Sequence, residues 1–135
     1  ADGERAFAVQ VVLLAAFGAL GAVSRYLVSG WVYRAFGESF PLGTLAVNLI
    51  GCFLLGAINH VGHHTELIAA HHRPALTIGL LGAFTTFSTF GYETFKQLEA
   101  GQWFFGFLNV AANVVIGLFC VWGGILTARY FVGGA

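Results

Sequence analysis

The sequence has very few charged residues. Its 135 residues include six Lys and Arg and six Asp and Glu, 9% in all, whereas 58% are hydrophobic. A soluble domain usually has about 25% charged residues, so this chain has too little charged surface to cover a water-exposed sphere. The scarcity of charge argues against a soluble enzyme and predicts an integral membrane protein. The zero net charge and the absence of a basic run argue against a nucleic-acid partner.

The usual marks of catalysis are also missing. The sequence has no phosphate-binding loop, no cluster of metal-ligand residues and no pair of nucleophile and base, so no enzyme activity is expected. Its two cysteines, Cys52 and Cys120, fall inside apolar stretches, where a free thiol packs as a small apolar group. They predict neither a disulfide nor a metal site.

Four long stretches contain no charge, and each is about as long as a membrane-spanning helix, which needs about 20 residues. A β-barrel would instead show short segments of alternating polarity. The run LAVNLIGCFLLGAI is apolar on both faces, which favours helices. We therefore predict an all-α membrane protein, a single domain over residues 1–135, with spans at about 6–30, 40–62, 75–97 and 101–131.

The positive charges are balanced between the two sides of the membrane, although an excess of Lys and Arg in cytoplasmic loops normally sets orientation. Such a balance predicts a chain that inserts both ways, and two opposed copies would form an antiparallel homodimer. Four helices are also too few to enclose a pathway alone, and 19 glycines favour close helix packing. One side carries Arg5, Arg73 and Arg129, and the other carries Arg25, Arg34 and Lys96.

Polar residues within the spans are candidates for function because they are expensive in lipid. Thr44 and Asn48 are four residues apart and share a helix face, as do Asn109 and Asn113. Amide groups can donate hydrogen bonds to an anion without carrying a charge. The alternative is that these residues only join helices by hydrogen bonds. The polar set comprises Ser24, Arg25, Thr44, Asn48, Thr85, Thr86, Ser88, Thr89, Asn109 and Asn113.

The third span combines glycine, Thr and Ser over residues 82–89, all of them weak helix formers. We expect a break in the helix at Gly82–Thr85, which would free carbonyl oxygens near the bilayer centre, where unwound carbonyls can hold Na⁺. Phe87 and Phe90 lie three residues apart on one face. Their electropositive ring edges could stabilise an anion, although such a pair more often packs in a core or against lipid.

Taken together, these motifs resemble the Fluc (CrcB) family of fluoride channels, which are small four-span proteins that form antiparallel, dual-topology homodimers. The resemblance covers nearly the whole chain. Its most specific feature is the combination of the Thr-Thr-Phe-Ser-Thr-Phe string at residues 85–90 with the Gly-Thr-(three residues)-Asn motif at residues 43–48. It departs in the fourth span, where family members often carry Tyr and Ser. The matching segments are residues 21–26, 43–48, 82–90 with Glu93, and Ala112-Asn113 with Gly117.

The resemblance implies passive export of fluoride that protects the cell from its toxicity, through two pathways per dimer. Phe87 and Phe90 would form a phenylalanine box facing Asn48, and Gly82 and Thr85 would offer carbonyls to one central structural Na⁺ at the dimer interface. Arg25 would lie at the vestibule. Glu93, Ser88, Thr89 and Thr44 would line the route, and Asn109 and Asn113 would continue it in the fourth span.

Other functions stay open from the residues alone. A proton-coupled multidrug exporter also uses four spans, but it needs a carboxylate within the membrane, and the first span has none. A tetraspan assembly subunit would use the polar faces only for packing. Five histidines around the second loop could form a metal or pH-sensing site, or simply an interfacial polar turn. The family in single-domain form indicates a bacterial inner membrane. The histidines are His60, His63, His64, His71 and His72.

Overall fold

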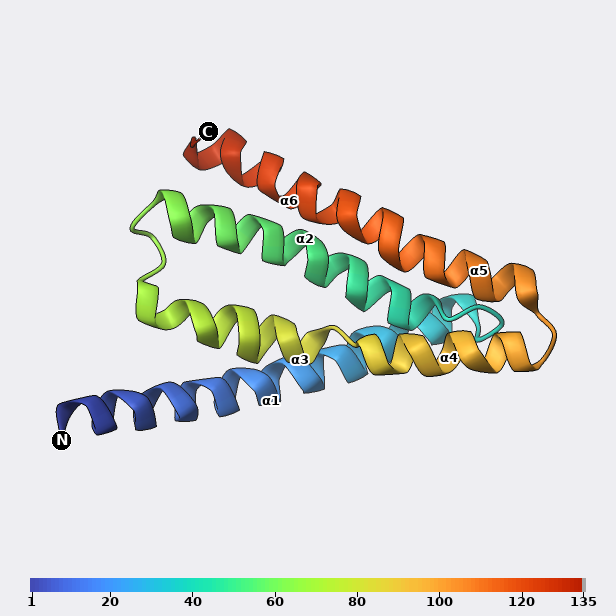
Figure 1. The fold of residues 1–135 in the computed structure, drawn as a ribbon, viewed down its shortest axis with the longest axis horizontal. Helices are drawn as coiled ribbons and strands as arrows, with labels where there is room; N and C mark the ends of the chain where they lie inside the picture. Colours follow the sequence, from blue (N-terminus) through green and yellow to red (C-terminus); the bar gives the residue numbers. More distant parts are fainter. Residues whose placement is uncertain (135) are drawn as a thin grey trace.

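The computed structural model describes residues 1–134, and all regular secondary structure in this part of the chain is helical, with no β-strand (Figure 1). Four helical segments are long and apolar enough to cross a membrane, which confirms the predicted all-α fold with four spans. The chain is thus a multi-pass membrane protein. Ala135, the last residue of the predicted domain, lies outside the described residues.

The first two spans are continuous helices, and the last two are composite. Gly37 and Gly101 have positive φ angles of 81° and 75°, in the turns that follow the first and third spans. The spans are α1 (Asp2–Phe36); α2 (Leu42–His64); a third segment of η1 (Ala70–His72), the π-helix η2 (Ala75–Leu81), α3 (Gly82–Phe84) and α4 (Phe87–Glu99); and a fourth of α5 (Trp103–Ala111), the π-helix η3 (Ala112–Ile116) and α6 (Gly117–Val132).

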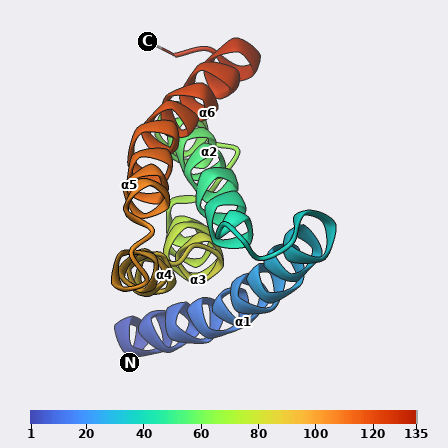
Figure 2. The same ribbon diagram turned by 90° about the vertical axis from the view of Figure 1, so that its right-hand side faces the viewer.

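The spans run up and down, so both termini lie at one end of the bundle (Figure 1). Helix α2 lies beside α6 along most of its length, α1 packs on η2 and on α2, and α4 pairs with α5. Seen from the end, α2 stands between α1 and the fourth span, with α3 and α4 below it (Figure 2). The polar faces of the last three spans are thereby brought toward one another.

Small residues allow α2 and α6 to approach closely. A Cβ on Gly56 would overlap the carbonyl oxygen of Val121, and a Cβ on Gly124 would overlap the carbonyl oxygen of Phe53. The two glycines thus sit where one helix backbone contacts the other. The expectation that glycines within the spans form packing surfaces is confirmed here.

Most of the apolar surface faces outward. Val47 and Asn109 are the largest side chains that are fully buried, whereas many Phe, Trp and Leu side chains on all four spans are exposed. In an aqueous protein such a surface would drive aggregation, but in a bilayer it meets lipid. The interior is correspondingly small, and much of it is polar.

Candidate functional site: a polar track between the spans

The third span is broken at Thr85 and Thr86, and the thin connection is visible between α3 and α4 (Figure 1). Both residues have extended backbone, with ψ of 158° and 110°. The predicted break is confirmed, but it lies later than expected, because Gly82 remains helical. Thr86 explains the position, since its hydroxyl oxygen accepts the amide N–H of Thr89 at 3.2 Å and caps α4.

The break redirects two backbone amides. In an unbroken helix the N–H groups of Thr86 and Thr89 would donate to the carbonyls four residues earlier, those of Gly82 and Thr85. Instead, Thr86 donates to Asn48 Oδ1 at 2.8 Å, and Thr89 donates to the Thr86 hydroxyl. The Gly82 and Thr85 carbonyls therefore lose their helical donors.

Two glycines of α2 make room for neighbouring spans beside the polar residues. A Cβ on Gly51 would overlap the Cγ2 methyl of Thr85, so this glycine lets the broken segment lie against α2. A Cβ on Gly43 would overlap the ring of Tyr33, which lies across α2 at that point. These glycines fix where the first and third spans contact the second.

Amide side chains of α2 and the fourth span form one connected line. Asn48 Nδ2 donates to Asn113 Oδ1 at 2.9 Å, and Asn113 Nδ2 donates to Asn109 Oδ1 at 3.0 Å. Asn109 Nδ2 then donates to the hydroxyl of Thr94 at 2.9 Å, and this hydroxyl donates to the carbonyl of Phe90 at 2.8 Å. We call this line the amide relay. It joins three spans through neutral groups.

A second polar cluster surrounds the carboxylate of Glu93. The hydroxyl of Thr44 donates to Glu93 Oε1 at 2.6 Å, and the hydroxyl of Tyr33 donates to Oε2 at 3.4 Å. Thr44 is buried and Glu93 is partly buried. These hydrogen bonds give the Glu93 side chain polar partners from the first and second spans.

Three hollows follow one another along these polar groups. One, of about 400 Å³, opens at the Glu38 and Gln102 loops, and it shares Tyr33 and Glu93 with a second of about 430 Å³. The second hollow includes Arg25 and shares Thr86 with a third of about 290 Å³. Asn48, Asn113, Gly82, Thr85, Phe87 and Phe90 line this third hollow. The three hollows lead from the end of the bundle with the Glu38 and Gln102 loops toward the break in the third span, and we call them the polar track.

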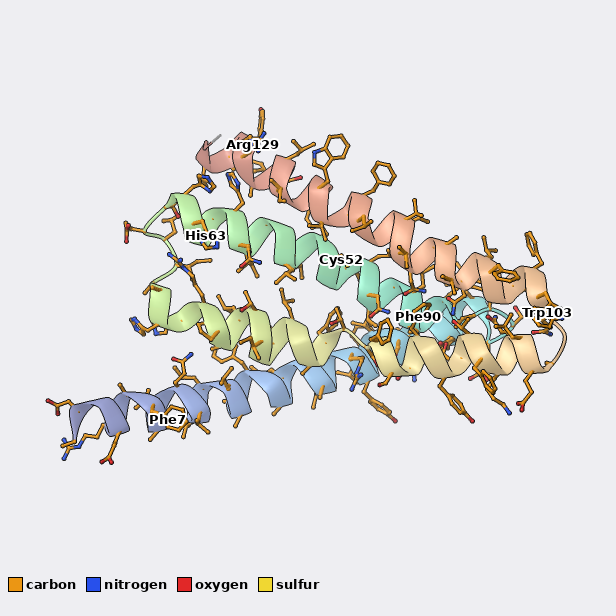
Figure 3. The ribbon with its side chains drawn as sticks, viewed as in Figure 1. Phe7, Cys52, His63, Phe90, Trp103 and Arg129 are labelled. Carbon is orange, nitrogen blue, oxygen red and sulfur yellow. The ribbon has the colours of Figure 1, made fainter. Side chains whose placement is uncertain are left out.

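The two predicted phenylalanines meet at the third hollow. Their ring centroids are 5.5 Å apart at an interplanar angle of 65°, so one ring presents its edge to the other. Phe90 is 8% exposed and lies on the inner side of α4, toward α2 (Figure 3), whereas Phe87 is 83% exposed. Only half of the pair is covered within one chain.

Most of the predicted site residues line the three hollows, and two do not. Ser88 is exposed and Asn109 is fully buried, and neither lines any of the three hollows. Thr89 and Thr44 both line the second hollow with Arg25 and Glu93. The roles assigned to all these residues stay predictions.

The histidines form no large cluster. His60 is buried and donates from Nε2 to the carbonyl of Gly133 at 2.8 Å, and its ring stacks on that of His64. Within residues 1–134 no group of three or more His, Cys, Asp or Glu side chains is placed to hold a metal ion. The pair instead joins the end of α2 to the end of the chain.

Sequence reasoning missed Tyr33 and Thr94. Tyr33 lies beyond the predicted first span, and Thr94 follows the more conspicuous Glu93. Thr94 lies four residues after Phe90, which places the two on one helix face and was the available signal. Nothing in the sequence alone pairs Thr94 with Asn109.

A four-span membrane protein with a polar track between its spans is the class that this fold and site define. The sequence model described as "CrcB-like protein, Camphor Resistance (CrcB)" matches residues 12–125. This chain belongs to the CrcB family.

Three relatives show how closely the chain follows other members. It is 52% identical over 120 residues to the fluoride-specific ion channel FluC of Geobacter metallireducens, covering 89% of this chain and 97% of that one. For the protein of the same name in Geobacter sulfurreducens the identity is 53% over 119 residues, covering 88% and 96%. For that of Pelobacter propionicus it is 50% over 121 residues, covering 90% and 94%.

Proposed function

We propose that the protein is a fluoride-selective channel of the bacterial inner membrane, which lets fluoride leave the cell passively and so protects it from fluoride toxicity. The observation that carries the proposal is the hollow where the Asn48 amide meets the Phe87 and Phe90 rings. The chain is also about half identical to relatives named as fluoride-specific ion channels, over nearly their whole length.

The chemistry of the track suits a small, strongly hydrated anion. Fluoride must exchange its water for other donors, and those donors must hold it weakly enough for it to leave. The Thr89 hydroxyl accepts from Thr86 at 2.9 Å, which leaves its own proton for an anion in the hollow that Arg25 also lines. In the next hollow Asn48 Nδ2 donates to the carbonyl of Thr86 at 3.2 Å and to Asn113, so an anion there would take the place of the Thr86 carbonyl, and the phenylalanine ring edges would face it.

An antiparallel homodimer completes this pathway in our proposal. The third hollow is open in one chain, and the exposed Phe87 ring lies at its rim. A second copy would cover this ring and supply the opposite wall. The balance of positive charge between the two sides favours opposite insertion, and the two-fold symmetry of such a dimer gives two equivalent pathways.

A structural Na⁺ at the dimer interface fits the residues around the break. Hard cations prefer oxygen ligands, and the carbonyls of Gly82 and Thr85 lose their helical donors to Asn48 and Thr86. Both residues also line the open third hollow. In this proposal the ion neutralises carbonyl dipoles between the two chains and takes no part in fluoride movement.

The deciding experiment is ion efflux from liposomes that contain the purified protein. Fluoride should leave rapidly under its own gradient, whereas chloride in matched liposomes should stay. Protein-free liposomes provide the background. Absent fluoride efflux, or equal efflux of both anions, would overturn the proposal. Proton movement driven by an organic cation would instead favour the exporter.

A further inference from the structure

Tyr33 lies at the boundary between two hollows of the polar track. Its side chain comes from the last turn of α1 and lines both the first hollow, at the Glu38 and Gln102 loops, and the second hollow, which includes Arg25. Glu93 is the other residue that lines both hollows. An anion that moves from the first hollow to the second must therefore pass a phenol and a carboxyl group.

The carboxyl group at this boundary offers an anion no donor. Both oxygens of Glu93 accept hydrogen bonds, Oε1 from the hydroxyl of Thr44 and Oε2 from the hydroxyl of Tyr33. The Thr44 hydroxyl has a single proton, and it is donated to Glu93 at 2.6 Å. Neither Glu93 nor the Thr44 hydroxyl thus has a proton left for an anion at the boundary.

The proton of the Tyr33 hydroxyl is held much more weakly. Within residues 1–134 this hydroxyl reaches two acceptors, Glu93 Oε2 and Thr44 Oγ1, and both lie at 3.4 Å. Hydrogen bonds between a hydroxyl and an oxygen usually measure about 2.5–3.0 Å. A hydrogen bond of ordinary length to an anion is stronger than either contact, so an anion in one of the hollows can take this proton as an acceptor.

Packing on α2, and not these long contacts, holds the ring of Tyr33 in place. A Cβ on Gly43 would overlap Cε2 of the ring, so the bare backbone of this glycine is what lets the ring lie across α2. The ring can therefore keep its position while the hydroxyl proton changes its acceptor. This combination of a fixed ring and a weakly bound proton suits a donor to an ion that must later leave.

We infer that Tyr33 is a donor in the anion pathway, whose hydroxyl binds fluoride as the ion passes Glu93 between the first and second hollows. The inference rests on the proposed function, because it names a further binding residue of the fluoride pathway. When the ion arrives, the hydroxyl exchanges its long contacts to Glu93 and Thr44 for the ion, and it returns to them when the ion has passed.

Removal of the Tyr33 hydroxyl tests the inference. Tyr33→Phe keeps the ring on Gly43, and fluoride efflux from liposomes should fall about tenfold, which corresponds to about 1.4 kcal/mol. Tyr130→Phe is the matched control, because Tyr130 is 85% exposed and lines none of the three hollows, and it should conduct like the wild type. If Tyr33→Phe also conducts like the wild type, or if the two variants are equally impaired, the inference is wrong.

A stability measurement separates ion binding from a purely structural role of the hydroxyl. Contacts at 3.4 Å contribute little to folding, so the Tyr33→Phe and Tyr130→Phe proteins should unfold at the same denaturant concentration in mixed micelles. If the hydroxyl instead served to join α1 to α2 and α4, Tyr33→Phe would unfold earlier or fail to assemble. Either of these results would overturn the inference.

The wild type decides between the two levels of the argument. If wild-type protein shows no selective fluoride efflux, the proposed function fails and Tyr33 has no anion to bind. If the wild type conducts and the Tyr33 variant contradicts the expected pattern, only the inference about Tyr33 fails.

Discussion

Gly51→Ala should disturb the break in the third span through a single atom. The added Cβ overlaps the Cγ2 methyl of Thr85, while its next contacts, at 3.6 Å to Thr85 Cβ and 3.7 Å to Phe84 Cδ2, are ordinary. Thr85 must therefore move away from α2. Thr86 would move with it, and its hydrogen bond to Asn48 would lengthen.

The size of the effect is set by two opposing terms. Overpacking of a close-packed interior costs about 1–3 kcal/mol, whereas replacing a helical Gly with Ala gains up to about 1 kcal/mol. Gly30→Ala is the matched control, since Gly30 is also helical and a Cβ there meets nothing within 4 Å. We expect Gly51→Ala to be about 1–3 kcal/mol less stable than Gly30→Ala.

Thr85→Ser provides the compensating change. It removes the Cγ2 methyl but keeps the hydroxyl, which donates to the carbonyl of Leu81 at 3.0 Å. The double variant should regain most of the stability lost in Gly51→Ala, and its fluoride efflux should recover in parallel. The measurements are reversible unfolding in mixed micelles and efflux from liposomes. Equal stability of the two alanine variants, or no recovery with serine, would refute the reasoning.

Three further predictions concern the track and the packing around it. Phe90→Ile should reduce fluoride efflux at least tenfold in a folded protein, whereas Phe95→Ile, at a ring 61% exposed, should conduct normally in the same assay. Thr44→Val removes the 2.6 Å hydrogen bond to Glu93 and should lower efflux severalfold more than Thr44→Ser does. Gly124→Leu should separate α6 from α2 and lower the unfolding free energy by about 3 kcal/mol or more, as measured in mixed micelles.

The four spans could be predicted because charge and hydropathy act on each span separately. A membrane helix needs only its own apolar length, and the charges around Glu38, Arg73 and Glu99 divide this chain at nearly the right places. The exact position of the break was harder to predict. Gly82 looked the weaker helix former, but the Thr86 side chain caps α4 and so sets the break at residues 85 and 86.

From the sequence alone, site residues could be grouped only when they lie on the same face of the same helix. Spacing placed Thr44 beside Asn48, and Asn109 beside Asn113, because residues four apart share a face. Contacts between spans depend on how each helix is rotated and shifted along its neighbour, which no single face specifies. For that reason Thr94 was missed, although it binds Asn109 at 2.9 Å.

Neutral groups allow much of the interior of this protein to be polar without a buried ion pair. A buried ion pair would hold an anion too tightly, but amides carry no net charge and can present either a donor or an acceptor. In an anion pathway the choice between the two amide orientations would be a disadvantage, because the amide oxygen repels the anion that the amide N–H attracts. The backbone of Thr86 removes this choice for Asn48, because its N–H donates to Oδ1 and its carbonyl accepts from Nδ2. A chain with 9% charged residues can in this way fix the orientation of a polar side chain in its interior.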